Sequence, residues 1–185
     1  MQTLLLSTGI VALAEIGDKT QLLSLVLAAR YKRPWPIVAG ILCATLLNHA
    51  AAGAVGTWLM TVVGPDVMRW VLGLSFLAMA VWMLIPDKLD DEGPKASDRH
   101  GVFVATTILF FLAEMGDKTQ VATVALAARF QQLALVVAGT TLGMMIANAP
   151  VVFFGDALAK RVPLRVVHAV TAVLFAVLGV TALVA

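Results

Sequence analysis

Two copies of one acidic segment are the residues in this sequence best suited to chemistry. Each copy reads Glu-x-Gly-Asp-Lys-Thr-Gln, the first from Glu15 to Gln21 and the second from Glu114 to Gln120. Apolar residues precede and follow both copies, so we expect the segments inside hydrophobic helices near the middle of a membrane. An ionised side chain at that depth costs at least about 2.5–3.5 kcal/mol, so each carboxylate needs a counter-charge, a proton or a bound ion.

The spacing within each segment gathers its polar groups. Residues three and four apart lie on one face of a helix, so Glu15, Asp18 and Lys19 are expected to project together. Gly17 has no side chain, which allows either close approach of another helix or local unwinding that exposes backbone carbonyls. Hydroxyl and amide oxygens beside the acidic groups are expected as supporting ligands or parts of the ion pathway, at Thr20, Gln21, Thr119 and Gln120.

If the two segments converge, four carboxylates and two lysines carry a formal charge of −2, which matches one divalent cation. The expected metal ligands are Glu15, Asp18, Glu114 and Asp117. The expected groups for charge balance or proton coupling are Lys19 and Lys118. Oxygen ligands disfavour copper and, more weakly, zinc, and suit Ca²⁺, Mn²⁺ or Mg²⁺. Of these, Mg²⁺ is the weakest candidate because it gives up its water reluctantly.

The same carboxylates suggest how the protein could return to its starting conformation after the cation has left. Carboxylates that crowd together in a low dielectric are expected to take up protons when the cation leaves. Protonation would neutralise the empty site for its return across the membrane. The residues therefore support the hypothesis of cation/proton exchange.

Three other interpretations compete with an ion transporter. The acidic and basic groups could form a buried ion-pair clasp between the halves, although pairing leaves the excess negative charge unexplained. An intramembrane aspartyl protease also uses two membrane aspartates, but Glu15 and Glu114 replace the first glycine of its expected Gly-x-Gly-Asp. A small-solute exporter of the lysine-exporter type has a similar six-helix plan, and loss of metal binding in Glu15→Gln or Glu114→Gln would separate it from a metal transporter.

Composition indicates how these segments are positioned. Of 185 residues, 61% are hydrophobic and 13% charged, and the mean hydropathy is +0.94, so the bilayer is the expected solvent. At about 20 residues per span, the chain has room for about six helices and no separate soluble domain. A net charge of +2 is too small to indicate nucleic-acid binding. We therefore predict an all-α membrane protein, not an enzyme, with apolar segments near 3–29, 36–63, 67–85, 102–128, 133–155 and 163–184.

The sequence repeats itself with an offset of 99 residues. Glu15 and Glu114 share this offset, and it also aligns Gly56 with Gly155 and Phe76 with Phe175. The predicted organisation is a first repeat over residues 1–85, an acidic cytoplasmic linker over 86–101 and a second repeat over 102–185. Three spans in each repeat require opposite topologies, and transporters built this way bind their substrate where inverted repeats meet, near the midplane.

Three residues outside the two segments could also take part in chemistry. His49 and Asn148 are also 99 residues apart and are possible pathway residues, although such groups more often form hydrogen bonds between helices. The single cysteine, Cys43, excludes an internal disulfide and a cysteine-rich metal site. It is expected to act as a small packing residue.

Loop charges predict the orientation. One side of the membrane collects nine basic residues and the other only Arg69 and Arg129. The basic side should be cytoplasmic, which places both termini outside and the linker inside. The nine residues are Arg30, Lys32, Arg33, Lys88, Lys95, Arg99, Lys160, Arg161 and Arg165.

Two copies of Glu-x-Gly-Asp-Lys-Thr, each opening a three-helix repeat and separated by an acidic linker, resemble the family of Golgi calcium/manganese-proton antiporters and their bacterial manganese-exporting relatives. The resemblance covers nearly the whole chain. It implies export of Mn²⁺ or Ca²⁺ from the cytosol, with the ion as substrate rather than cofactor, along a path formed by Glu15, Asp18, Glu114 and Asp117. The short chain resembles the bacterial members, which implies a bacterial inner membrane.

Overall fold

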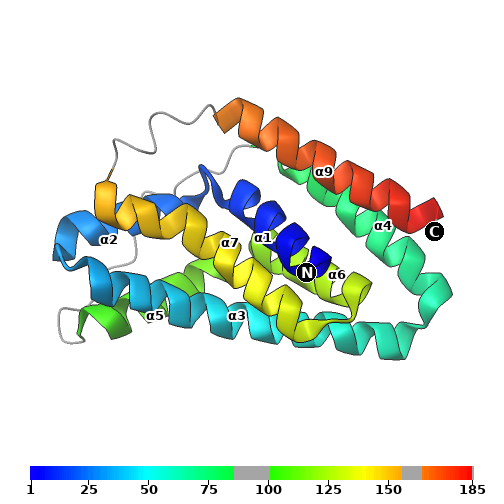
Figure 1. Ribbon diagram of the computed structural model, residues 1–185, viewed down its shortest axis with the longest axis horizontal. Coiled ribbons are helices and arrows are strands. Elements are labelled where there is room, and N and C mark those ends of the chain that lie inside the picture. Colours follow the sequence, from blue (N-terminus) through cyan, green and yellow to red (C-terminus); the bar gives the residue numbers. More distant parts are fainter. Residues whose placement is uncertain (86–100, 156–163, 185) are drawn as a thin grey trace.

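The computed structural model describes residues 1–85, 101–155 and 164–184, and this part of the chain is entirely helical with short turns. The predicted all-α class is confirmed for these residues, while almost all of the predicted linker, at 86–100, lies outside them. Figure 1 shows the arrangement of the helices. They are α1 (Gln2–Glu15), α2 (Lys19–Tyr31), α3 (Pro34–Val63), α4 (Pro65–Trp82), α5 (Val102–Glu114), α6 (Lys118–Phe130), α7 (Leu133–Phe154) and α9 (Leu164–Val184).

Four of the described helices, α3, α4, α7 and α9, are long and apolar enough to cross a membrane. Proline occupies the first turn of α3 and α4, where its missing N–H leaves no hydrogen bond unmade. Large apolar side chains cover the outside of the described structure, including Leu5, Phe154 and Val173, which are 65%, 71% and 61% exposed. An apolar surface of this kind requires lipid, so the protein is an integral membrane protein.

The expectation of continuous helices over 3–29 and 102–128 was wrong. The first segment is broken between α1 and α2 at residues 16–18, and the second between α5 and α6 at 115–117. The acidic groups of each segment therefore do not share one face of a single helix, as the spacing of Glu15, Asp18 and Lys19 had predicted. They lie instead at the two helix ends that flank each break.

Contacts between the halves are repeated with the same register. A Cβ at Gly40 in α3 would meet the carbonyl oxygen of Phe103 at 2.9 Å and Cβ of Thr106 at 2.7 Å in α5. A Cβ at Gly139 in α7 would meet the carbonyl oxygen of Leu4 at 2.7 Å and Cβ of Ser7 at 2.8 Å in α1. The corresponding partners are 99 residues apart, so α3 docks on α5 as α7 docks on α1. Each half thus supplies the long helix that supports the broken helix of the other.

Helices α4 and α9 lie side by side and run in opposite directions along one edge of the structure (Figure 1). Phe76 and Phe175, another pair with the offset of 99, stack with ring centroids 6.2 Å apart. Gly73 and Gly179 allow the two backbones to approach, since a Cβ at Gly179 would meet the Gly73 carbonyl oxygen at 3.0 Å. Two equivalent helices therefore pack antiparallel against each other.

Candidate metal site

Each helix break is a tight turn that requires its glycine. The backbone N–H of Asp18 donates to the carbonyl of Glu15 at 3.0 Å, Ile16 has φ −63° and ψ 117°, and Gly17 has φ +84°. These values are those of a type II turn, in which the third residue needs positive φ and is usually glycine. The second segment repeats the turn, with Met115 at φ −64° and ψ 121° and Gly116 at φ +76°.

The glutamine of each segment stabilises its own turn. Gly17 donates its N–H to Gln21 Oε1 at 3.0 Å, and Gly116 donates to Gln120 Oε1 at 2.8 Å. Gln21 also donates through Nε2 to the carbonyl of Ala147 in α7, at 3.1 Å. Both glutamines thus use their amide oxygens to hold the turn, and their role as supporting ligands stays a prediction.

Three acidic side chains from the two turns converge. Glu15, Glu114 and Asp117 each offer a carboxylate oxygen, and these oxygens lie within 4.8 Å of one another. Their exposed fractions are 0%, 0% and 3%. The predicted convergence of the two segments is therefore present, and the acidic triad, as we call these three residues, draws on both halves of the chain.

Helix dipoles make the triad more demanding of a cation. Glu15 and Glu114 are the last residues of α1 and α5, where the partial charge of the helix is negative and no basic residue lies in the last turn. A carboxylate is disfavoured at such an end. Asp117 is better placed, because it precedes the positive N-terminus of α6. The helix ends therefore add to the need of the two glutamates for a positive partner or a proton.

Asp18, the fourth predicted ligand, does not belong to the triad. It is 2% exposed, occupies the N-cap position of α2 and lies within electrostatic range of Glu15. The equivalent Asp117 does reach the triad. Two local sequences that differ only at Ile16 and Met115 thus hold their aspartates differently relative to the shared centre.

The two motif lysines also differ. Lys19 Nζ lies 3.0 Å from Asp117 Oδ1, an ion pair that joins the two halves. Lys118 is 3% exposed and donates to the carbonyl of Ile85, just beyond α4, at 3.3 Å. Lys19 therefore pairs with one carboxylate of the triad, whereas Lys118 also contacts the chain that leaves α4.

The motif threonines surround Glu114. Thr119 Oγ1 donates to Glu114 Oε2 at 2.9 Å, which orients this carboxylate. The fully buried Thr20 of the other half lies beside the same carboxylate, without the geometry of a hydrogen bond. Both hydroxyls thus face one member of the triad.

Asn148 and His49 occupy equivalent positions with different surroundings. Asn148 Nδ2 donates to Glu15 Oε1 at 3.0 Å, and Ser24 Oγ donates to Asn148 Oδ1 at 2.8 Å. Asn148 therefore orients a triad carboxylate from α7. His49 in α3 is 0% exposed, and neither of its ring nitrogens has a hydrogen-bond partner in the described structure.

Within the described ranges, the two turns are covered unequally. At the first, His168 Nε2 lies 3.3 Å from the carbonyl oxygen of Ile16, and Leu164 lies against Gly17, where an added Cβ would meet Leu164 Cδ2 at 2.6 Å. At the second, Met115 is 57% exposed and a Cβ at Gly116 would have no described atom within 4 Å. The sequence contains no motif at 164–168, so this cover was not predicted.

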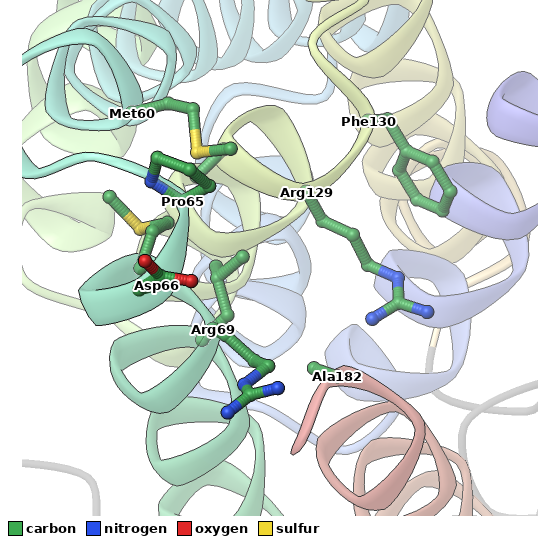
Figure 2. Close-up of a pocket in the computed structure, with 10 residues that line it drawn as sticks. Met60, Pro65, Asp66, Arg69, Arg129, Phe130 and Ala182 are labelled. Atoms are coloured by element: carbon green, nitrogen blue, oxygen red, sulfur yellow. The ribbon is translucent and has the colours of Figure 1, made fainter. Parts of the chain in front are cut away.

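The residues equivalent to Leu164 and His168 line a cavity instead. Pro65 and Arg69, which lie 99 residues earlier, border a cavity of about 450 Å³ together with Arg129 and Phe130. Figure 2 shows the Arg69 and Arg129 side chains extending toward Ala182 at the end of α9. The start of α4 therefore lies at the C-terminal end of α6, whereas the start of α9 lies over the turn between α1 and α2.

Comparison with known proteins gives consistent matches along the chain. A family model described as "Divalent cation/proton antiporter GDT1" matches residues 3–91 and 102–185. A Vibrio cholerae protein named "Putative manganese exporter" is 53% identical over 176 residues, covering 95% of this chain and 87% of that protein. A GDT1-like protein of Synechocystis is 29% identical over 194 residues, covering 90% and 89%. GDT1-like protein 5 of Arabidopsis thaliana is 24% identical over 214 residues, covering 96% and 93%. No solved structure matches the chain.

Proposed function

The chain belongs to the GDT1 family of divalent cation/proton antiporters, and from this premise we propose that it exports Mn²⁺ from the cytosol in exchange for protons. Membership makes the protein a cation transporter and not an enzyme, with the metal ion as substrate rather than cofactor. An intramembrane protease is thereby excluded. The metal, the coupling to protons, the ligands and the membrane topology are parts of the proposal.

The acidic triad is the observation that carries the proposal. Its three carboxylates and the ammonium group of Lys19 give a formal charge of −2 in a buried centre. Including Asp18 and Lys118 leaves that sum unchanged. A divalent cation balances it, whereas the ion-pair clasp between Lys19 and Asp117 alone leaves two buried glutamates without compensation.

The ligand chemistry supports Mn²⁺ and Ca²⁺ among the divalent ions. Carboxylate oxygens suit Mg²⁺, Ca²⁺ and Mn²⁺, and Mg²⁺ keeps its water too firmly for a centre that is 0–3% exposed. The name of the Vibrio cholerae relative, which is 53% identical, favours Mn²⁺ between the remaining two.

Protons are the simplest replacement for the departing ion. Removing the cation leaves Glu15, Glu114 and Asp117 close together in a low dielectric, where like charges repel strongly. Protonating two of the carboxylates restores the charge balance that the ion provided. Exchange of one divalent ion for two protons is the stoichiometry that this balance favours.

We propose that the chain crosses the membrane six times, as inverted halves over 1–85 and 102–185. The helices α1 and α5 have 14 and 13 residues, too few for a full span, so each is expected to complete its crossing with the helix that follows. The repeated docking of α3 on α5 and of α7 on α1, and the antiparallel packing of α4 on α9, support inverted repeats. Loop charges support a topology with both termini outside a bacterial inner membrane and the linker inside.

Unequal cover of the turns supports alternating access. Inverted repeats that adopt different conformations open a central site to one side of the membrane at a time. Leu164 and His168 cover the first turn in this state. In the opposite state, the equivalent Pro65 and Arg69 would cover the turn at Gly116, and the first turn would open.

Transport by the purified protein in liposomes tests this function. Uptake of Mn²⁺, Ca²⁺ and Mg²⁺ is measured with an imposed pH gradient, with the reverse gradient and with none, using Asp66→Asn as a control outside the acidic triad. We expect Mn²⁺ to move in the direction opposite to the proton flow and to reverse when the pH gradient is reversed. This flux should be lost in Glu15→Gln and Glu114→Gln. Flux that ignores the gradient would exclude proton coupling, and solute flux without divalent-ion binding would favour a lysine-exporter type of function.

A further inference from the structure

The histidine that corresponds to Asn148 is buried beside the other half of the site without a partner. His49 is 0% exposed, and both ring nitrogens lack a hydrogen-bond partner in the described structure. Thr45, one helical turn earlier in α3, is also 0% exposed, and its hydroxyl has no partner either. Burying a polar group without a hydrogen bond costs free energy, and such groups in native proteins call for an explanation.

The register of the helices indicates that His49 lies on the Glu114 side of the site. Asn148 in α7 reaches Glu15 at the end of α1, with 3.0 Å between Nδ2 and Oε1. The docking of α3 on α5 repeats the register of α7 on α1. Position 49 is therefore related to Glu114 in the same way that position 148 is related to Glu15. Glu114 Oε1 is buried and has no hydrogen-bond partner, while Oε2 accepts from Thr119. By this register, we expect the unpartnered imidazole of α3 and the unpartnered carboxylate oxygen at the end of α5 on the faces where these two helices pack.

In the conformation described here, His49 and Glu114 do not satisfy each other's hydrogen-bonding groups. The His49 nitrogens do not belong to the group of ligand atoms within 4.8 Å that defines the acidic triad. A change in the imidazole rotamer or in the approach of α3 is therefore needed before a nitrogen joins the carboxylates. Binding of the ion would supply the attraction for this change, because a metal ion brings its ligand atoms closer together.

We propose that His49 supplies a nitrogen ligand to the transported ion and thereby favours Mn²⁺ over Ca²⁺. This inference rests on the proposed function and adds a ligand and a basis for selectivity. Imidazole nitrogen is a common ligand of transition metals, whereas Ca²⁺ takes oxygen ligands almost throughout. Asn148, the equivalent residue, offers an amide and instead orients Glu15. The two halves thus contribute differently at the same position, one a ligand and the other a positioning group.

Electron spin-echo envelope modulation of the Mn²⁺-loaded protein tests the ligand directly. Mn²⁺ coordinated by imidazole shows modulation from the bound ¹⁴N nucleus, and labelling all histidines with ¹⁵N changes that modulation without any substitution. We expect the nitrogen signal in the wild-type protein, its change on ¹⁵N-histidine labelling and its loss in His49→Asn and His49→Gln. His168→Gln, which removes a histidine from α9, should keep the signal.

The outcomes separate this inference from the proposed function. Bound Mn²⁺ without a nitrogen signal in the wild-type protein overturns the role of His49 and leaves the carboxylate site standing. A nitrogen signal that survives His49→Gln likewise overturns it. Absence of any bound Mn²⁺ overturns both. When the binding of Mn²⁺ and of Ca²⁺ to the same variant is compared, His49→Asn should weaken Mn²⁺ binding more than Ca²⁺ binding. Equal weakening of both contradicts the proposed preference.

Discussion

Lys19 of the first half lies 3.0 Å, Nζ to Oδ1, from Asp117 of the second half. The side chains are 35% and 4% exposed, so the lysine reaches from a partly open position to a buried carboxylate. Asp117 also belongs to the acidic triad. The same carboxylate is therefore shared between a fixed cation of the protein and the proposed transported cation.

Lys19→Gln should make the metal-free protein less stable and increase its dependence on metal. Removing the ammonium group leaves Asp117 buried without this partner, which is costly when a charge is excluded from water. A bound divalent ion should restore the balance. Thermal unfolding in detergent, with and without Mn²⁺, should show a larger stabilisation by metal than in the wild-type protein. Arg33→Gln, an exposed change at the start of α3, is the control. An unchanged response in Lys19→Gln would argue against shared use of Asp117.

Asn148→Ala should weaken Mn²⁺ binding by about 10–100-fold, the usual effect of removing a group that orients a metal ligand. Its amide holds Glu15 Oε1 at 3.0 Å, and Ser24 fixes the amide in turn. Calorimetric titration of the purified protein measures the affinity. Asn48→Ala removes an equally buried asparagine that donates to the carbonyl of Phe111 instead. If both substitutions changed the affinity alike, the effect would be one of general packing.

Three Gly→Ala substitutions should separate backbone strain from crowding. Gly17 and Gly116 have φ of +84° and +76°, so alanine should cost about 1–2 kcal/mol at either position. Gly17→Ala should cost more, because its methyl group meets Leu164 Cδ2 at 2.6 Å. Gly9 lies within α1 with open space around it, where alanine should stabilise by up to about 1 kcal/mol. Chemical unfolding in detergent ranks the three, and destabilisation by Gly9→Ala would contradict this account.

Crosslinking should detect whether α9 leaves the turn at Gly17 when α4 moves over the turn at Gly116. In a Cys43→Ser background, a bifunctional reagent should join Ile16→Cys to His168→Cys in the state described here, where the native groups lie 3.3 Å apart. The equivalent pair, Met115→Cys with Arg69→Cys, should join only in the opposite state. Each crosslink should stop transport, and reversing the pH gradient should shift the yields in opposite directions. Yields that stay constant under all conditions would exclude this exchange.

The offset of 99 residues and the acidic spacing made much of the site predictable. They identified the two segments, the four long helices to within a few residues at each end, and the convergence of Glu15, Glu114 and Asp117. The break in the helix was not decided by sequence, because a glycine serves close packing and positive φ equally well. The hydrogen bond from Gly17 to Gln21 shows why unwinding is stable here.

The unequal roles of equivalent residues could not be predicted at all. Asp18 and Asp117 lie in nearly identical local sequences, yet only Asp117 joins the triad. A nearly symmetric sequence in an asymmetric conformation must assign different contacts to matching residues. The cover of the first turn by Leu164 and His168 has the same origin, because it depends on where α9 stands relative to α1.

The number of Mn²⁺ ions bound per chain tests the central claim most directly. If Glu15, Glu114 and Asp117 form one composite site, equilibrium dialysis with metal analysis should give one ion per wild-type chain. Glu15→Gln and Glu114→Gln, although in opposite halves, should each abolish binding of that same ion. Two ions per wild-type chain, or one ion retained after either substitution, would contradict a shared site and indicate that each acidic segment binds metal on its own.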